Sequence, residues 1–416
     1  MALISERYVN DGKASLNLSE LQKEYIRIFE QKCQSGEYSL EQRECECGES
    51  DFELIAQKDR YGIAVDTVIC RNCGLIMTNP CLDEKSNNSF YDKEYPFIYR
   101  AEEKPSEEKF QEQREEAEFI VGFIQKHTGL YSGKVLEIGC ADGRNVAVFA
   151  EHGYDVCGID LSHTYVEFGK EKGLNLICSD AATYAKNGNT YDLIVLNQVL
   201  EHFINPGREL EIIKGMLKPD GYLYIAVPGV KALTFGAYRS DFLLMLQNAH
   251  VFNFTRESLC GMMRKYGFDS IFCNEIICGI FQKRESKIVG REDTYSRTKQ
   301  YLADVEKNAG DTRGLLKRRF REIVSDYGPA EVVLYGTATE LDEFVQELTD
   351  VSPIRGFFYS DKKKPEEVSA FIRTQAGNVK CLFIIDAAKN AVLLRAFSEE
   401  IRSHQIAIYA AYSDTF

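Results

Sequence analysis

Apolar and polar positions alternate in a regular order between residues 130 and 285. Short runs rich in valine, isoleucine and leucine are separated by longer stretches with apolar residues at helical spacing. The runs expected to be strands are Val135–Ile138, Val156–Ile159, Leu174–Cys178, Leu193–Asn197 and Tyr222–Val227. Strands that alternate with helices in this way form a parallel, doubly wound sheet, so the fold class predicted for this region is α/β.

The same alternation begins again after Gly328-Pro329. The apolar runs that predict a smaller α/β domain over residues 329–416 are Val332–Gly336, Gly356–Tyr359, Leu382–Ile385 and Ile406–Tyr409. The turn after Gly336 looks like a nucleotide-binding turn without the full glycine fingerprint, so we expect this domain to contribute packing and substrate shape. The charged segment 286–328 is expected to be a helical linker, with its basic run Lys317–Arg321 on a solvated helix face.

Three different patterns precede the core. Residues 1–43 are expected to form a helical arm, because Leu21, Tyr25 and Ile28 recur at helical spacing. Residues 44–82 carry two pairs of cysteines around a hairpin pattern. Residues 83–129 combine an aromatic cluster from Phe90 to Tyr99 with an acidic helix expected from about Glu102 to Lys126.

Composition and charge narrow the class of protein. The chain has 416 residues, which suggests about two or three domains, and its 44% hydrophobic and 27% charged residues are ordinary for a globular protein. A formal net charge of −14 argues against nucleic acid as a partner. No run approaches the roughly 18 apolar residues of a membrane span, and the first residues lack the order of a signal peptide. We therefore expect a cytoplasmic protein without a membrane partner.

The 13 cysteines are expected to be thiols or metal ligands rather than disulfides. Cys45 and Cys47 form one pair, and the second pair follows after a stretch long enough for a hairpin. The four residues are Cys45, Cys47, Cys70 and Cys73. Four thiolates in two pairs are the ligands of a tetrahedral, structural zinc ribbon. The alternative is four buried cysteines, and Cys33 or Cys81 would replace a wrongly assigned ligand.

The segment Glu137-Ile-Gly139-Cys-Ala-Asp-Gly143 follows the first expected strand of the core. Glycines allow the backbone to pass close to a ligand, and a carboxylate beside them suits a cationic ligand and repels a phosphate. A dinucleotide turn would instead carry G-x-G-x-x-G without acids at the contact. The segment therefore predicts the turn that binds the methionine end of S-adenosylmethionine (SAM).

Further polar residues stand where strands end, which is the edge at which doubly wound sheets bind ligands. Asp160, followed by Leu161, ends the second strand, where a carboxylate can accept hydrogen bonds from both ribose hydroxyls. Asp180 and Ala181 follow the third strand, where the adenine is expected, and Asn197 ends the fourth. A lone Asp at such a place is often only a helix N-cap. The joint order and spacing of these residues favours the cofactor.

With these motifs, residues 130–285 resemble a class I SAM-dependent methyltransferase, which has a Rossmann-like core. The resemblance includes Val199-Leu-Glu-His202, the run His250–Leu259 and Tyr266-Gly-Phe268. It implies that the glycine turn holds the methionine end, and the two strand-end aspartates the ribose and the adenine. It also implies a backbone contact, rather than a nucleophile, at Cys140.

The order of ribbon, core and small Rossmann-like domain resembles the sugar C-methyltransferases of deoxysugar and glycan biosynthesis, which implies a sugar or nucleotide-sugar acceptor. That family carries a Tyr-His-Glu-His run whose last histidine acts as a base or orients the substrate; the matching stretch here is Gln247-Asn-Ala-His250. His250 is therefore a candidate for catalysis, and His202, which follows Glu201, is a second candidate on the acceptor side; each could instead be a packing residue. The family also implies that an aromatic segment covers the site, here Tyr91, Tyr95 and Tyr99. Tyr95 is a third catalytic candidate, with packing of the ribbon as the alternative.

The sequence thus predicts a SAM-dependent methyltransferase that acts on a sugar or nucleotide-sugar and holds a structural zinc. One alternative is an O-methyltransferase of another small molecule or of a capsule component. Another is a non-catalytic SAM-binding scaffold, against which Glu137, Asp160 and Asp180 argue. The choice between a carbon and an oxygen acceptor, the identity of the sugar and the oligomeric state stay open.

Overall fold

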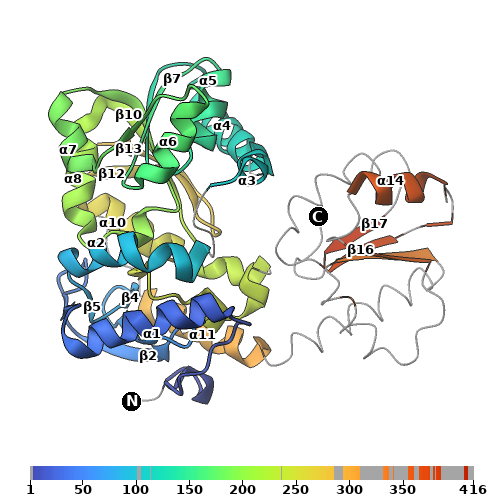
Figure 1. Ribbon diagram of the computed structural model, residues 1–416, viewed down its shortest axis with the longest axis horizontal. Coiled ribbons are helices and arrows are strands. Elements are labelled where there is room, and N and C mark those ends of the chain that lie inside the picture. The colour runs from blue at the N-terminus through green and yellow to red at the C-terminus, as the bar shows by residue number, and fades with distance from the viewer. Residues whose placement is uncertain are drawn as a thin grey trace. The chain divides into compact units, whose positions relative to one another are not determined.

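The computed structural model describes residues 3–100, 105–112, 114–235, 237–284, 294–309, 331–336, 341, 355–359, 365–374, 378–379, 381–385 and 407–410. The chain divides into two compact units. The first consists of Met1–Val230 and Leu246–Gln300, and the second of Lys231–Met245 and Tyr301–Phe416. Each unit contains a sheet of its own (Figure 1).

The main sheet of the first unit has seven strands in the order β12-β13-β10-β9-β6-β7-β8. In chain order these are β6 (Lys134–Ile138), β7 (Asp155–Asp160), β8 (Leu176–Cys178), β9 (Tyr191–Asn197), β10 (Leu217–Ala226), β12 (Phe268–Cys273) and β13 (Cys278–Lys283). The first five pair in parallel, as the sequence pattern predicts. β13 is antiparallel to β10 and β12 to β13, so the sheet is mixed.

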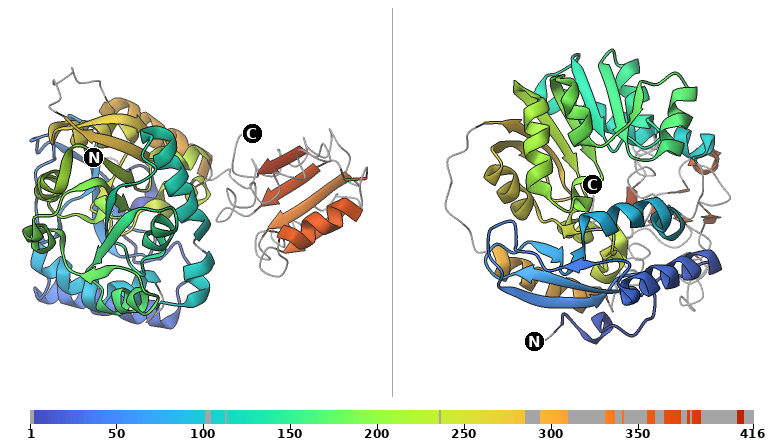
Figure 2. Two further views of the ribbon diagram at one scale, coloured as in Figure 1. Left: turned by 90° about the horizontal axis from the view of Figure 1, so that it is seen from above. Right: turned by 60° about the vertical axis from the view of Figure 1, so that its left-hand side comes forward.

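Helices cover both faces of this sheet (Figure 2). They are α4 (Arg114–Thr128), α5 (Arg144–Glu151), α6 (His163–Glu171), α7 (Ala181–Tyr184), α8 (Pro206–Met216) and α10 (Arg256–Lys265). Alternate residues of β9 enter different cores: Ile194 and Leu196 pack on one side, and Leu193 and Val195 on the other. A strand buried on both faces needs an unbroken apolar run, which explains the pattern of this segment.

The predicted hairpin between the cysteine pairs is present, but its sheet is shared with the core. β2 (Phe52–Lys58), β3 (Ala64–Cys70) and β4 (Ile76–Thr78) are antiparallel neighbours. β11 (Phe252–Asn253), which comes from the core region, adds a fourth strand beside β4. The structure therefore makes the ribbon and the α/β core parts of one unit.

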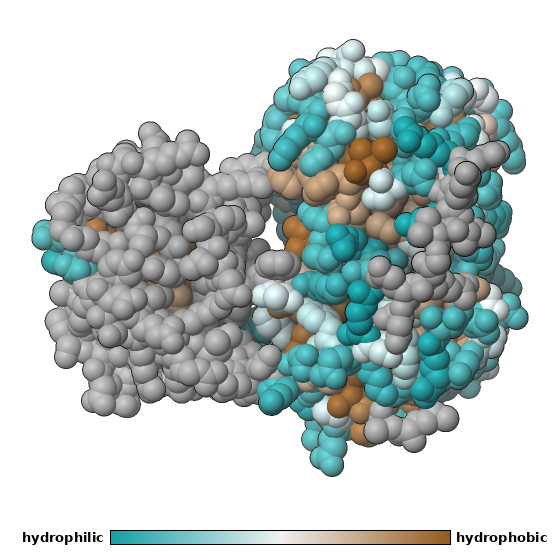
Figure 3. All heavy atoms as spheres, turned by 180° about the vertical axis from the view of Figure 1, so that it is seen from behind, coloured by the Kyte–Doolittle hydropathy of each residue, from teal (hydrophilic) through white to brown (hydrophobic). Residues whose placement is uncertain are grey.

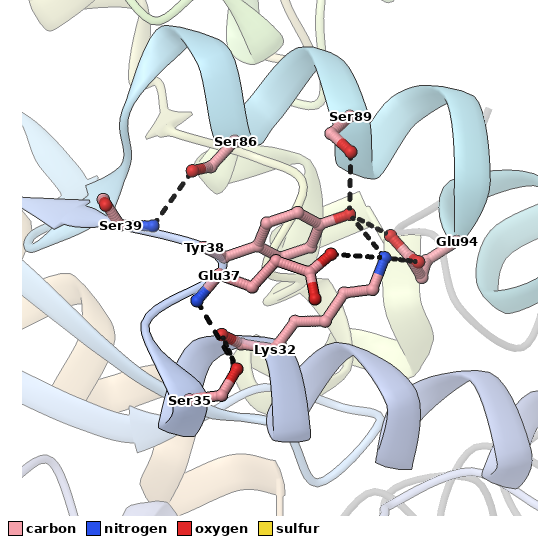
Figure 4. A network of polar contacts seen from close by, with 8 residues as sticks. All are labelled: Lys32, Ser35, Glu37, Tyr38, Ser39, Ser86, Ser89 and Glu94. Carbon is pink, nitrogen blue, oxygen red and sulfur yellow. Dashed lines mark hydrogen bonds and ion pairs between the residues drawn. The ribbon is translucent and has the colours of Figure 1, made fainter.

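The helical arm is α1 (Glu20–Ser35), and it begins with a capping box between Ser19 and Gln22. A polar network joins it to α2 (Glu84–Lys93) (Figure 4). The Lys32 ammonium lies 2.9 Å from a carboxylate oxygen of buried Glu94, and the Tyr38 hydroxyl donates to the other oxygen at 2.6 Å. This network fixes the end of α2, from which the aromatic segment continues into η2 (Pro96–Arg100).

Shorter elements complete the first part of the chain. They are η1 (Glu6–Tyr8), β1 (Leu40–Glu41), β5 (Cys81–Leu82), α3 (Glu107–Glu112), η3 (Ala185–Asn187), η4 (Leu200–His202), η5 (Val230–Phe235), η6 (Ala237–Ser240) and α9 (Phe242–Met245). The segment expected to be one acidic helix contains α3 and α4. The described part of the face in Figure 3 is mainly hydrophilic, with small separate apolar areas. Among the described residues, no helix has the length and apolar character needed to cross a bilayer.

The second unit contains a four-stranded parallel sheet in the order β15-β14-β16-β17. Its strands are β14 (Val332–Gly336), β15 (Gly356–Tyr359), β16 (Cys381–Ile385) and β17 (Ala407–Ala410), as the apolar runs predict. Val368 of α14 (Pro365–Thr374) packs against the sheet. Of the predicted linker, α11 (Thr294–Ala309) is described. The basic run Lys317–Arg321 and the residues directly after Gly336 lie outside the described residues.

Candidate functional site

The glycine turn after β6 has the backbone shape that its sequence suggests. Gly139 and Gly143 have φ angles of 73° and 80°, in the left-handed region that favours glycine. A Cβ atom on Gly139 would lie 2.5 Å from a methyl group of Val199, and one on Gly143 would lie 2.8 Å from Leu176. Side chains at either position would therefore push apart the end of β6 and its neighbours.

Glu137 is buried beneath this turn, with 1% of its surface exposed. The Asn145 amide donates to one carboxylate oxygen at 2.6 Å, while the other oxygen has no hydrogen-bond partner among the described residues. Burial raises the pKa of Glu137 to about 8. A buried carboxyl with one oxygen that has no partner among the described residues, placed beside the glycine turn, is suited to a ligand that carries a positive charge.

Asp160 connects the glycine turn to the end of β7. One carboxylate oxygen accepts from the Ala141 backbone N–H and the other from Ser162 N–H, each at 2.8 Å. Each carboxylate oxygen can accept a further hydrogen bond. Leu161, directly after Asp160, is 67% exposed at this edge of the sheet.

Asp180 is the N-cap of α7. Helix capping, the alternative expected for a strand-end aspartate, is therefore what this side chain does in the structure. Its carboxylate accepts from the Thr183 backbone at 2.7 Å and from the Thr183 hydroxyl at 2.9 Å. Burial opposes ionisation of Asp180, but these hydrogen bonds outweigh it and lower the pKa. Ala181 beside it is buried, and Asn197 is half-buried at the end of β9.

Cys140 lies in the glycine turn with 4% of its surface exposed. A Cβ atom on Gly158 of β7 would lie 2.7 Å from the Cys140 sulfur, so the thiol packs tightly against the backbone of β7 at this glycine. Burial raises the pKa of the Cys140 thiol far above its ordinary value. A neutral, packed thiol is consistent with a backbone contact and makes a poor nucleophile.

A second group of polar side chains lies beyond the end of β9. Glu201 and His202 belong to η4, and His250 stands just before β11. The two imidazole rings are 4.8 Å apart, and the Nε2 atoms of His202 and His250 lie 3.9 and 4.0 Å from the same Glu201 oxygen. We call these three residues the acceptor cluster. Val199, against which the glycine turn packs, is only three positions from His202.

Glu201 is a member of this cluster that the sequence pattern did not predict as a site residue. Its carboxyl is 1% exposed, and neither oxygen has a hydrogen-bond partner among the described residues. Burial raises its pKa to about 8. The signal that could have identified it is a glutamate directly before a candidate histidine at a strand end.

The contacts of His202 indicate which of its nitrogens carries the proton. Nδ1 lies 2.8 Å from the Ala249 carbonyl oxygen and 2.7 Å from the Tyr91 hydroxyl. Because a carbonyl only accepts, Nδ1 donates and Nε2 keeps its lone pair. Tyr95 stacks on Tyr91, with ring centroids 4.5 Å apart. The Tyr91 hydroxyl thus contacts His202 Nδ1, and the Tyr95 ring lies edge-on to the His202 ring.

His250 is buried, and its contacts come from the hairpin of the ribbon. The Gln247 amide donates to His250 Nε2, and Arg60 donates to the Gln247 amide oxygen at 2.7 Å. Asp59, the neighbour of Arg60 in the turn between β2 and β3, accepts from Asn248 N–H at 2.9 Å. Burial lowers the pKa of His250 well below its ordinary value, so its imidazole is neutral. These contacts could not be predicted from sequence patterns, since nearly 190 positions separate the partners.

The four predicted ligand cysteines lie together. The Cys45 and Cys73 sulfurs are 3.4 Å apart, the Cys47 and Cys70 sulfurs 3.6 Å apart, and all four fall within 4.8 Å of one another. Zn–S bonds of about 2.3 Å in a tetrahedron separate the sulfurs by roughly 3.8 Å. The arrangement fits a closed four-thiolate ion site. Cys33 and Cys81, the possible substitutes, are not members of this group.

Residues 110–271 match a family model described as a methyltransferase domain. The chain contains a class I SAM-dependent methyltransferase domain. The matched range includes the glycine turn, the strand-end aspartates and all three residues of the acceptor cluster. The ribbon cysteines and the four-stranded sheet of the second unit lie outside the matched range.

Known proteins resemble only part of the chain. A ubiquinone biosynthesis O-methyltransferase of Coxiella burnetii is 27% identical over 110 residues, which are 25% of this chain and 47% of the relative. A protein of the same name from an Azoarcus species is 30% identical over 133 residues, which are 30% of this chain and 57% of the relative. The chain thus spans about half the length of these relatives. A solved structure, the 1,6-didemethyltoxoflavin-N1-methyltransferase of Burkholderia thailandensis, aligns with 50% of this chain and 96% of its own, at 15% identity and a TM-score of 0.37.

Proposed function

We propose that this protein transfers a methyl group from SAM to a carbon or oxygen atom of a sugar or nucleotide-sugar. The observation that carries the proposal is the position of the acceptor cluster beside the glycine turn, with Val199 between them. The three-part order of ribbon, methyltransferase domain and small α/β domain supports a sugar acceptor. An oxygen acceptor on another small molecule is the second candidate, because the relatives named above are O-methyltransferases.

The methyltransferase domain offers a partner for each part of SAM. The glycine turn and Glu137 are suited to the cationic methionine end, and Asp160 with Leu161 to the ribose. Asp180, Ala181 and Asn197 border the place assigned to the adenine. SAM supplies an electrophilic methyl group on a positive sulfur, and the protein aligns the acceptor with it.

The acceptor loses a proton when it takes the methyl group, and we assign this step to the acceptor cluster. His202 keeps an Nε2 lone pair because Ala249 and Tyr91 engage its Nδ1. Its side chain is 17% exposed, whereas that of His250 is 6% exposed and held by Gln247. His202 is therefore the better placed of the two histidines to act on a substrate, and His250 supports it.

Labelled SAM and a pool of nucleotide-sugars test this function. Wild-type protein should label the pool, and His202→Gln should slow transfer by about 100-fold or more, the usual contribution of acid–base catalysis. His202→Gln should still bind S-adenosylhomocysteine in calorimetry. His152→Gln, at an exposed histidine paired with Glu118, is the matched control and should leave both properties unchanged. Carbon NMR of the product identifies the methylated atom. Absence of cofactor binding to wild-type protein would refute the proposal.

We further propose that the four-cysteine group holds one structural zinc ion. The sulfur separations support this, and so do Gly48 and Gly74, whose left-handed backbone lets the chain turn directly after each cysteine pair. A closed set of four thiolates has no open position for substrate, so the ion would stabilise the ribbon.

A further inference from the structure

The acceptor cluster contains an unusual buried group. Glu201 is 1% exposed, and neither carboxylate oxygen meets a hydrogen-bond donor among the described residues. Leaving a buried polar group without a hydrogen-bond partner is unfavourable, and more so for a charged group. A carboxyl in this position therefore suggests a partner that the described residues do not supply.

Two imidazole nitrogens face the same carboxylate oxygen. The Nε2 atoms of His202 and His250 lie 3.9 and 4.0 Å from it, and one ligand atom from each of the three residues falls within 4.8 Å of the others. Two ligands bound at about 2.1 Å to one ion are separated by at most about 4.2 Å. The three atoms can thus reach a common ion after small movements of their side chains.

The surroundings of His202 support the same conclusion. A metal-binding histidine usually donates its second ring N–H to a carbonyl or carboxylate, which fixes the ring and its tautomer. Here Nδ1 donates to the Ala249 carbonyl, and the Tyr91 hydroxyl lies beside it. These contacts place the ring N–H on Nδ1, and Nε2, which carries the lone pair, lies 3.9 Å from a Glu201 oxygen.

We propose that Glu201, His202 and His250 bind a divalent metal cation. Two histidines and one carboxylate are a ligand set for zinc and for iron(II), cobalt(II) or manganese(II), and three protein ligands leave coordination positions open. The inference rests on the proposed function and deepens it. With the ion bound, the Nε2 atom of His202 would be a metal ligand and no longer the base. The ion would instead acidify an acceptor oxygen in an open position, and the proton would pass to solvent water.

Gln247 competes with the cation for one ligand. Its amide donates to His250 Nε2, and Arg60 holds the Gln247 side chain from the other side. Cation binding must replace this hydrogen bond by coordination. Gln247→Ala should therefore bind the cation more tightly than wild type, whereas a variant that loses a ligand should bind it more weakly.

Cobalt(II) titration of full-length protein with its ribbon zinc in place tests the proposal. Wild type should bind one further equivalent in calorimetry, with visible cobalt bands and without the intense thiolate-to-cobalt charge-transfer band of a cysteine site. Glu201→Gln should weaken this binding at least tenfold, Gln247→Ala should strengthen it, and His152→Gln should leave it unchanged. No further equivalent in wild type, or equal affinity in Glu201→Gln, overturns the cation site.

Methyl transfer and S-adenosylhomocysteine binding, measured on the same preparations, separate this inference from the proposed function. Protein that keeps its ribbon zinc but is freed of other ions by a mild chelator should bind the cofactor product normally and transfer methyl groups slowly until cobalt(II) or manganese(II) is added. A full rate of methyl transfer without a second ion would refute the cation site and would leave the proposed methyltransferase function unaffected. Loss of cofactor binding in wild type refutes the methyltransferase itself.

Discussion

At the scale of single residues, burial changes the protonation of the Glu137 carboxyl. Its carboxyl has one partner, Asn145, and one oxygen without a partner among the described residues. Burial raises its pKa to about 8, so at pH 7 the group is largely protonated in the absence of a ligand. A positive charge nearby would favour the ionised form.

Cofactor binding should therefore release a proton from Glu137. At pH 7 we expect up to about one proton per chain on binding of S-adenosylhomocysteine, because the ammonium group of the ligand lowers the pKa of the carboxyl. Calorimetry in two buffers of different ionisation enthalpy measures this number. Glu137→Gln should bind without proton release, and equal release in the variant would contradict the assignment.

The same carboxyl makes stability depend on pH in a defined direction. The pKa of Glu137 in the folded protein is about 8, above the ordinary value of 4.5. Its contribution to the free energy of unfolding is therefore fully present below pH 4.5 and is lost as the pH rises through 8. A shift of this size corresponds to roughly 5 kcal/mol. In the ligand-free protein, Glu137→Gln should gain free energy of unfolding relative to wild type between pH 5 and 8, as measured by urea unfolding. A difference in unfolding free energy between Glu137→Gln and wild type that stays constant from pH 5 to 8 would argue against the raised pKa of Glu137.

At the scale of elements, the turn between β2 and β3 organises the loop that carries His250. Asp59 is fully buried and accepts from the backbone N–H groups of Tyr61, Ile63 and Asn248 at 2.9, 3.0 and 2.9 Å. The first two bonds shape the turn and the third binds the His250 loop. The turn between β2 and β3 is thus tied by a hydrogen bond to the loop that carries His250.

Removal of Asp59 should affect both stability and catalysis. Asp59→Ala leaves three backbone donors without this acceptor, which corresponds to roughly 3 kcal/mol of unfolding free energy. Methyl transfer should fall as well, because the His250 loop loses its anchor. Asp51→Ala, at an exposed ribbon aspartate paired with Arg71, is the control and should change stability by less than about 0.5 kcal/mol. Equal losses of stability and of methyl transfer in Asp59→Ala and Asp51→Ala would show that the Asp59 hydrogen bonds do not hold the His250 loop in a way that matters for transfer.

The ribbon cysteines give a prediction at the same scale. Cys70→Ser should remove the bound zinc and lower the thermal midpoint of the first unit, because ion binding contributes to folding of such sites. Cys81→Ser changes a buried cysteine outside the four-sulfur group and should retain one zinc per chain in elemental analysis. Wild-type protein that contains no zinc and is equally stable would refute the structural ion.

At the scale of the whole molecule, the two units have separate sheets and separate apolar cores. The core of the second sheet includes Val333, Leu382 and Val368, while the glycine turn and acceptor cluster belong to the first unit. Units with separate cores are expected to unfold in separate steps. Ligands of the methyltransferase domain should act on only one of these steps.

Calorimetric unfolding should accordingly show two transitions. S-adenosylhomocysteine at about 100 times its dissociation constant should stabilise the first unit by about 2.7 kcal/mol and raise only the corresponding transition. Asp160→Ala should reduce this shift. A single transition that moves as a whole would show that the two units unfold together.

The sequence by itself determined the parallel strands, the glycine turn and the positions of the strand-end acids. These features follow from local spacing: an apolar run between helices predicts a buried strand, and strands of one parallel sheet end at the same edge. The paired cysteines were also visible as a pattern, and the structure brings their sulfurs together.

Only the tertiary structure decided the composition of the acceptor cluster. His250 reaches Glu201 and His202 across nearly 50 positions of the chain, Tyr91 approaches His202 from more than 100 positions away, and Arg60 supports Gln247 from the ribbon. No periodic pattern links residues that meet through packing of separate elements. The methyl donor could therefore be predicted from a local motif, whereas the groups that we propose to face the acceptor depend on how the ribbon, the aromatic segment and the core pack together.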